Sequence, residues 1–247
     1  MLNKYLLFVG LLSILTAGGW IGWHEIKAQG ADWLPVRFVR VEGTFEYLTK
    51  DDVQRVLEGQ LINGIYNVDL GRVHDLVNAL PWVQKVIVRR QWPDVIDIKI
   101  VEQKALVRWG EKGLLNTEGE RFFPDNYQEF GDLPLIVGPV GNEKKLLQVL
   151  QSFNAALKKQ GFRLFELHVN DRRSWSLKLL DGMQIKLGRN ERNERFERFL
   201  RTLNLLGMEQ IGFIAVADLR YTNGYAISWK ENAPAIDWKK IAELNKL

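Results

Sequence analysis

The sequence predicts an α+β protein in two folded parts, held at its N-terminus by one membrane-spanning helix. Three observations carry this prediction. The chain begins with a long uncharged apolar run, continues with a stretch patterned as β-α-α-β-β, and then has a longer β-rich stretch with two amphipathic helices. Its 247 residues are enough for one large core or two smaller ones beyond the apolar run.

The apolar run covers residues 5–23. As a helix it would span about 28 Å, close to the roughly 30 Å hydrocarbon core of a bilayer. Trp20 and Trp23 lie at its end, where interfacial aromatics prefer to sit. A cleaved signal peptide is the alternative, but the run exceeds the usual apolar core of a signal, and no small-x-small cleavage site follows it. We therefore expect an uncleaved helix between a stub of residues 1–4 and a linker over residues 24–35.

Charge sets the expected orientation of this helix. Lys4 and the α-amino group are the only charges of the stub, so the positive-inside rule places the stub in the cytoplasm and the bulk across the membrane. The absence of cysteine suits an exported protein stabilised by its core. Lys and Arg total 34 against 30 Asp and Glu, and the signs are interleaved, which does not indicate nucleic-acid binding.

The first folded part is expected over residues 36–103. Thr49 with Asp52 three positions later is the pattern of a helix N-terminus, and Asp69 is placed to cap a second helix. Two helices on one face of a three-stranded sheet make a compact α+β unit of about 70 residues. The strands, which alternate in period two, are expected over residues 36–41, 83–90 and 95–102.

The second folded part is expected over residues 104–234, followed by a tail over residues 235–247 that ends in a loose helix. Asn223-Gly224 between two alternating runs predicts a tight hairpin. The arginines of the second helix alternate with glutamates, so we expect a solvated, salt-bridged face there. The helices are expected over residues 143–159 and 192–206, and the strands over residues 106–109, 114–116, 121–123, 133–137, 162–169, 174–180, 183–187, 213–221 and 225–230.

No pattern in the chain indicates catalysis, a cofactor or a metal. His24, His74 and His168 are not spaced with one another or with carboxylates as metal ligands, and no nucleophile motif or phosphate-binding glycine loop is present. We therefore expect no enzyme activity, no cofactor and no small-molecule substrate.

This arrangement resembles the FtsQ/DivIB family of bacterial cell-division proteins, in its Gram-negative form, and the β-α-α-β-β unit resembles a POTRA domain. The resemblance covers nearly the whole chain. The stub is shorter than in many relatives, and Lys104 stands where a proline is often seen. The stretches that carry the resemblance are residues 36–43, 81–93, 98–102, 105–109, 115–119, 172–177, 187–189, 216–221 and 226–229.

The resemblance implies a non-enzymatic scaffold of the divisome in the inner membrane at the division septum, with its bulk in the periplasm. Such a scaffold links early to late divisome assembly and to septal peptidoglycan synthesis, and its POTRA domain contacts further divisome components. The C-terminal domain would bind the FtsB–FtsL coiled coil by adding a strand of FtsB to its last strand. The implied contacts are Arg220, Tyr221 and Trp229, with the hairpin residues Thr222, Asn223 and Gly224, and either Arg172 or Arg173.

A two-residue turn at Asn223-Gly224 would pair Thr222 with Tyr225, Arg220 with Ile227 and Tyr221 with Ala226. We expect Tyr221 to pack on the partner and Trp229 to shape the other face, with a place in the core as the alternative for either residue. Arg220 would pair with a partner carboxylate or be solvated.

Two other classes of protein compete with this interpretation. An outer-membrane assembly or secretion protein also carries POTRA domains, but it needs a long C-terminal β-barrel that the remaining chain does not supply. An anchored periplasmic enzyme acting on the cell wall would need a nucleophile–base pair or a metal set.

Overall fold

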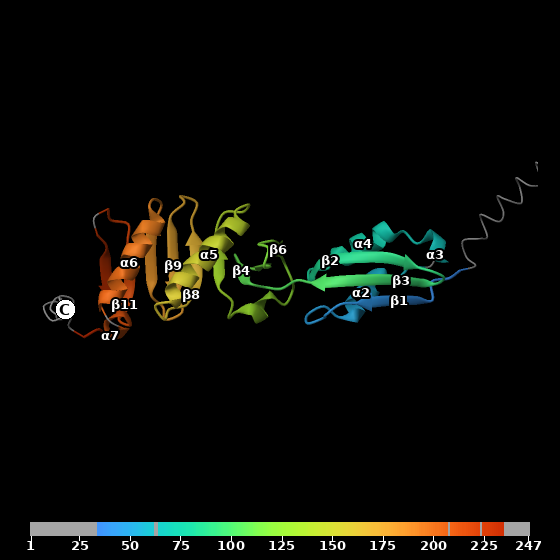
Figure 1. Ribbon diagram of the computed structural model, residues 1–247, viewed down its shortest axis with the longest axis horizontal. Coiled ribbons are helices and arrows are strands. Elements are labelled where there is room, and N and C mark those ends of the chain that lie inside the picture. The colour runs from blue at the N-terminus through green and yellow to red at the C-terminus, as the bar shows by residue number, and fades with distance from the viewer. Residues whose placement is uncertain (1–33, 62–63, 207, 223, 235–247) are drawn as a thin grey trace, which may run out of the picture. The chain divides into compact units, whose positions relative to one another are not determined.

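The computed structural model describes residues 34–61, 64–206, 208–222 and 224–234, and the chain divides into two compact units between Gln103 and Lys104 (Figure 1). The predicted membrane helix at residues 5–23 and the predicted loose helix at residues 237–247 lie outside this part of the chain. Within it, no helix is long and apolar enough to cross a membrane.

The first unit has a three-stranded sheet in the order β1-β3-β2, with β1 parallel and β2 antiparallel to β3. Its core lies between one face of the sheet and the helices, where Val53, Val73, Ile96 and Ile98 are buried. The elements are β1 (Phe38–Glu42), α2 (Lys50–Leu57), α3 (Gly64–Asn67), α4 (Leu70–Asn78), β2 (Val83–Gln91) and β3 (Val95–Glu102).

The predicted helix starts in this unit are confirmed. The Thr49 side chain accepts a bond from the backbone N–H of Asp52, and the Asp52 side chain accepts one from that of Thr49, so α2 begins with a capping box. Asp69 caps α4 through the N–H of Arg72. One element was not predicted: Gly64, expected in a turn, begins the short helix α3, which buries Ile65 completely.

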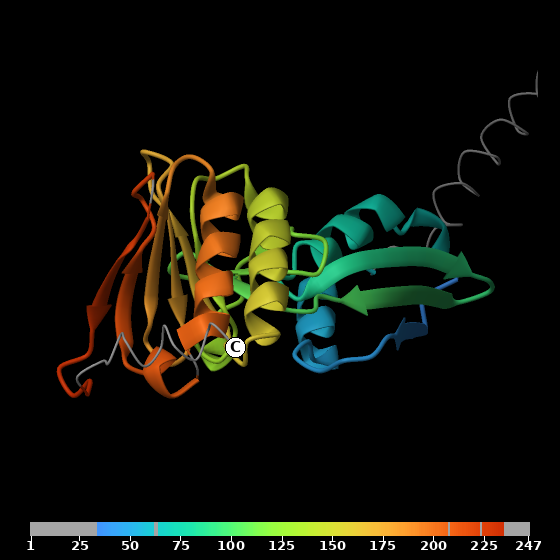
Figure 2. The same ribbon diagram turned by 60° about the vertical axis from the view of Figure 1, so that its left-hand side comes forward.

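The second unit is built on a nine-stranded sheet in the order β12-β11-β10-β9-β8-β7-β4-β5-β6. The long helices α5 (Glu143–Lys158) and α6 (Arg192–Leu206) lie side by side on one face (Figure 2). The strands are β4 (Val107–Trp109), β5 (Gly113–Leu115), β6 (Arg121–Phe122), β7 (Leu135–Val137), β8 (Leu164–Val169), β9 (Trp175–Leu179), β10 (Gln184–Gly188), β11 (Ile214–Asp218) and β12 (Ala226–Trp229).

Alternation along the strands places apolar side chains on the face that α5 and α6 cover. On β9, Trp175, Leu177 and Leu179 are buried, while the residues between them are polar and more exposed. The unit contains more helix than the two segments predicted, because the described chain also forms a 3-10 turn, η1 (Tyr127–Phe130), and a short helix, α7 (Met208–Ile211).

Candidate partner-binding edge of the second unit

Strand β12 lies at one end of the nine-stranded sheet. It is antiparallel to β11, and no strand of the described residues lies on its other side. Ile227 and Trp229 pack against the core, whereas Ala226 and Ser228 are exposed. Such an edge is suited to accept a further strand.

The connection between β11 and β12 is not the predicted two-residue turn. Asp218 pairs with Ala226 and Ala217 with Ile227, so the described residues 219–222, 224 and 225 belong to a loop between the two strands. The predicted pairing was therefore wrong by three positions on the β11 side. The physical reason is Leu219, which is completely buried and donates its N–H to the Lys186 carbonyl, so that it continues the ladder to β10 instead of turning back.

Arg220 folds back on Asp218. The guanidinium Nε lies 2.8 Å from Oδ1 of Asp218, and Nη2 lies 2.6 Å from Oδ2. Hydrogen bonding from this guanidinium holds the pKa of Asp218 below its ordinary value, and the same bond raises the pKa of Arg220. The Arg220 side chain stays about half exposed, so the pair orients it without hiding it.

Two arginines of α6 hold the backbone of this loop. Arg195 Nη1 donates to the Arg220 carbonyl at 3.0 Å, and Arg198 Nη1 donates to the Thr222 carbonyl at 3.2 Å. The predicted salt bridge is present, because Arg195 pairs with Glu191 at 3.4 Å, but the prediction of a purely solvated and salt-bridged face missed the bonds of these two arginines to the loop backbone. The signal in the sequence was their spacing of three residues, which places both on one helix face.

The two tyrosines of the loop have opposite roles. The Tyr225 hydroxyl donates to the Thr202 hydroxyl, and its ring meets Phe199 edge to face with centroids 5.9 Å apart. Tyr221 is 59% exposed. Tyr225 therefore fixes the loop on α6, while Tyr221 points its ring to solvent.

Arg172 and Arg173 lie in the β8–β9 turn, and both are exposed. Arg173 has a φ of 61°, and its N–H donates to the Asn170 carbonyl at 2.8 Å, which closes the turn. Arg173, unlike Arg172, lines a groove of about 610 Å³ with Lys145, Arg189 and Arg192.

The topology brings the implied partner residues together only in part. Arg220, Tyr221, Thr222 and Gly224 share one loop, and Asn223 lies outside the described residues. Strand β8 ends, β9 begins and β11 ends at the same edge of the sheet. The β8–β9 turn therefore lies at the same end of the strands as the β11–β12 loop, and β10 lies between β9 and β11. Trp229 pairs with Ile214 at the far end of β12, roughly 10 Å along the strand from Ala226.

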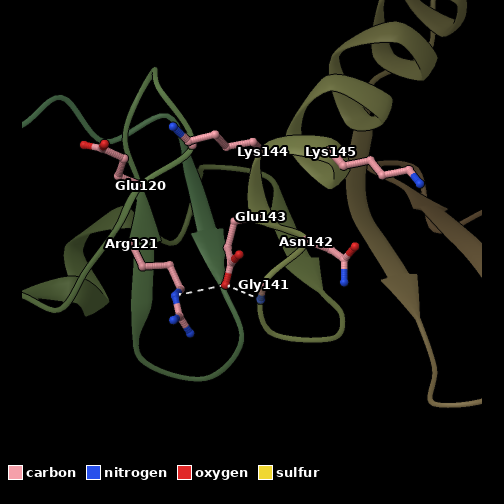
Figure 3. A pocket seen from close by; sticks show the side chains of 8 residues that line it. Glu120, Arg121, Gly141, Asn142, Glu143, Lys144 and Lys145 are labelled. Carbon is pink, nitrogen blue, oxygen red and sulfur yellow. Dashed lines mark hydrogen bonds and ion pairs between the residues drawn. The ribbon is translucent and has the colours of Figure 1, made fainter.

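A second hollow, of about 530 Å³, lies at the start of α5 (Figure 3). Its centre is Glu143, which pairs with Arg121 at 3.0 Å and accepts the Gly141 N–H at 3.0 Å. Burial alone would raise the pKa of Glu143, but backbone hydrogen bonds and the charge of Arg121 outweigh it and hold the pKa below its ordinary value. The carboxylate of Glu143 is therefore already paired within the chain, and its negative charge lies in the first turn of α5, where the helix dipole favours it.

Among the residues described, no group of three or more histidine, cysteine or acidic side chains is placed to hold a metal ion. Near β12, the described part of the second unit exposes an edge strand, cationic side chains and the ring of Tyr221.

Comparison with known proteins places these features in a family. The model of the "POTRA domain, FtsQ-type" matches residues 34–103, and that of "Cell division protein FtsQ/DivIB, C-terminal" matches residues 107–220. A Cell division protein FtsQ from Methylomonas methanica is 47% identical over 97% of this chain and 95% of its own length. Proteins of the same name from Allochromatium vinosum (31% identical, 91% of this chain and 89% of the relative) and Xanthomonas campestris pv. campestris (33%, 89% and 76%) are also similar. The chain belongs to the FtsQ/DivIB family of cell-division proteins.

Proposed function

We propose that this protein is a non-enzymatic scaffold of the divisome, anchored in the inner membrane and located at the division septum. Its C-terminal unit binds the FtsB–FtsL pair in the periplasm and so links early to late divisome assembly and septal peptidoglycan synthesis. Family membership supports the role in division. The observation that carries the binding proposal is an edge strand, β12, beside a fixed loop that exposes Tyr221.

An extended FtsB segment that adds to β12 would gain main-chain hydrogen bonds from the edge and specificity from side chains at its end. The loop favours such an anchor, because Arg195, Arg198 and Tyr225 fix its backbone before a partner arrives. A site that is already ordered loses less conformational entropy on binding.

Each residue implied as a contact has a proposed role. Tyr221 supplies apolar area, as exposed aromatic anchors do. Arg220, already oriented by Asp218, offers its remaining N–H groups to a partner carboxylate. Thr222, Asn223 and Gly224 are further contacts of the partner, Trp229 supports the far end of β12, and Arg172 or Arg173 extends the contact from the β8–β9 turn.

The membrane part of the proposal is supported by the apolar residues 5–23 and by the positive charge that precedes them. The N-terminus would lie in the cytoplasm and both folded units in the periplasm.

The test is a titration of the full-length chain, held in nanodiscs, with the periplasmic part of the cognate FtsB–FtsL pair. Tyr221→Ala is compared with Phe123→Ala, because Phe123 is 57% exposed but follows β6 at the other edge of the sheet. We expect Tyr221→Ala to weaken binding by a factor of ten or more, since hot-spot aromatics contribute about 2 kcal/mol or more, and Phe123→Ala to leave it unchanged.

If the wild type and both variants bind the FtsB–FtsL pair with equal affinity, the partner is correct but the binding site lies outside this loop. Absence of binding by the folded wild type would contradict the partner itself. Circular dichroism of each variant checks that the fold is intact.

A further inference from the structure

Three aromatic side chains are exposed at one end of the first unit. Among the residues described, Phe38 is 63% exposed, Tyr66 56% and Trp92 51%. At the opposite end the aromatics are covered: Trp82 is buried, and Tyr47 stacks on it with ring centroids 4.3 Å apart. The exposure of large aromatic rings is therefore confined to one end of the unit and needs an explanation.

These three residues, here called the aromatic end, come from three different elements. Phe38 begins β1 and pairs with Val95, Tyr66 lies in α3, and Trp92 lies in the β2–β3 turn. Figure 1 shows α3 and the β2–β3 turn at the end of the unit where the described chain begins. The rings of Tyr66 and Trp92 are in contact, with centroids 4.6 Å apart.

Arg90 links Tyr66 and Trp92, two of the three residues of the aromatic end. Its Nη2 donates to the carbonyls of Val68 at 2.9 Å and Tyr66 at 3.4 Å, and its guanidinium lies 5.9 Å from the centre of the Trp92 ring. These contacts tie α3 to the end of β2. The Tyr66 and Trp92 rings are thus held against each other, which lowers the entropy lost when they are covered.

Charges around the aromatic end are mixed, with cations at its rim. Arg37 is strongly exposed and lies 3.9 Å from Asp94, and Arg40 is bound to the side chain of Gln91. Further carboxylates of this unit are Asp97, opposite Arg40 in the β1–β3 ladder, and Asp69, which caps α4. Aromatic rings with arginines at their rim are typical of groups that lie at the level of lipid headgroups.

The course of the chain indicates what covers this surface. The Ile65 N–H donates to the Leu34 carbonyl at 2.8 Å, so the first described residue lies against α3, next to Tyr66. Leu34 follows Trp23, the last residue of the predicted membrane helix, by eleven positions. Even fully extended, that linker reaches at most about 40 Å. The aromatic end is therefore the part of the unit tethered nearest to the bilayer.

We propose that the aromatic end of the first unit inserts Phe38, Tyr66 and Trp92 into the headgroup layer of the periplasmic membrane surface. Trp and Tyr favour this layer because it accommodates an apolar ring and a polar group together. The contact restricts the tilt of the unit on its linker. This inference rests on the membrane anchoring in the proposed function.

The test uses the absence of cysteine from the chain, which allows a fluorophore to be placed at one introduced thiol. Tyr66→Cys and Phe38→Cys are labelled in the full-length protein, reconstituted into vesicles of phosphatidylethanolamine and phosphatidylglycerol that contain a lipid with a nitroxide near the headgroup. The matched control is Val101→Cys, because Val101 is 53% exposed on β3, six residues and roughly 20 Å beyond Val95.

We expect the nitroxide lipid to quench most of the fluorescence at positions 66 and 38 and little of it at position 101. Addition of Trp92→Ser to the Phe38→Cys protein is expected to reduce the quenching at position 38. Equal quenching at all three positions, or none at 66 and 38, would overturn the proposal, and the latter would point to a protein as the occupant of the aromatic end. Alkaline extraction of the same vesicles distinguishes failure of the membrane anchor from failure of the insertion. A chain released by alkali contradicts both the anchor and the insertion, whereas a retained chain with unquenched labels contradicts only the insertion of the aromatic end.

Discussion

Arg220 is held by a carboxylate of its own chain, and this changes how its proposed part in binding can be tested. Reversal of its charge would place two carboxylates together at Asp218, so lost binding would not distinguish a missing partner contact from a disturbed loop. Arg220→Gln is the better variant, because it removes the charge and still offers an N–H to Asp218.

The pair between Asp218 and Arg220 predicts a pH dependence. The folded pKa of Asp218 lies below its ordinary value of 3.8, so its contribution to stability is complete above that value and is lost as the pH falls through the lowered pKa. We expect the difference in unfolding free energy between the wild type and Asp218→Asn to be small near neutral pH, since the pair is partly exposed, and to shrink in acid. Urea unfolding over a pH series measures it, and a difference independent of pH would argue against the pair.

Arg195 illustrates a residue whose effect on a partner would be indirect. Its side chain is 12% exposed and bonded to the Arg220 carbonyl. Arg195→Met is expected to lower the unfolding free energy by about 1.5–3 kcal/mol, the range for a hydrogen bond from a charged group, and to weaken FtsB–FtsL binding by loosening the loop. Arg201→Met, at an exposed position of the same helix, is the control and should change neither quantity. If both variants behave alike, the loop does not depend on Arg195.

At the scale of elements, the start of α5 depends on a buried charge rather than on its N-cap. Asn142 makes no side-chain cap bond, and Glu143, 9% exposed, binds Arg121 and the N–H of Gly141 just before the helix. We expect Glu143→Gln to cost about 1–3 kcal/mol of unfolding free energy, because Arg121 loses its counter-charge. Thermal unfolding beside Lys144→Gln, an exposed neighbour, checks this expectation, and an equal effect of the two substitutions would contradict it.

Elements governed by local chemistry were predictable from the sequence. The capping box of α2 needs only Thr49 and Asp52, and both interact within one helical turn. The strands of the second unit follow from side-chain alternation in the same way. Gly64 was not predictable in this way. It begins α3 instead of a turn because the next residue, Ile65, is buried against the rest of the unit, and that contact is not local.

The candidate site was harder to predict for the same reason. Asn223-Gly224 is a strong local signal for a tight turn, but Leu219 is drawn into the core and bonded to β10, which moves Arg220 and Tyr221 out of the ladder. The bonds of Arg195 and Arg198 connect α6 to carbonyls more than twenty residues away. Alternating charges on a helix show that it is polar, but not which backbone groups lie within reach.

At the scale of the whole molecule, the chain has two cores that can be perturbed separately. Ile98 in the first unit and Ile185 in the second are both completely buried. Each change to Ala should cost its own unit about 2–5 kcal/mol. We expect Ile98→Ala to leave FtsB–FtsL affinity unchanged and Ile185→Ala to reduce it, since only the second core supports β12. Calorimetry with a binding titration measures both effects, and loss of affinity in Ile98→Ala would show that the units cooperate.

The position of β12 also has a consequence for timing. It is the outermost strand of its sheet and the last strand in the described chain, and a ribosome makes its product from the N-terminus onward. The surface that β12 offers is therefore completed only when the rest of the second unit has been synthesised. A partner that recognises it would pass over stalled or truncated chains, so entry into the assembly would be restricted to finished copies.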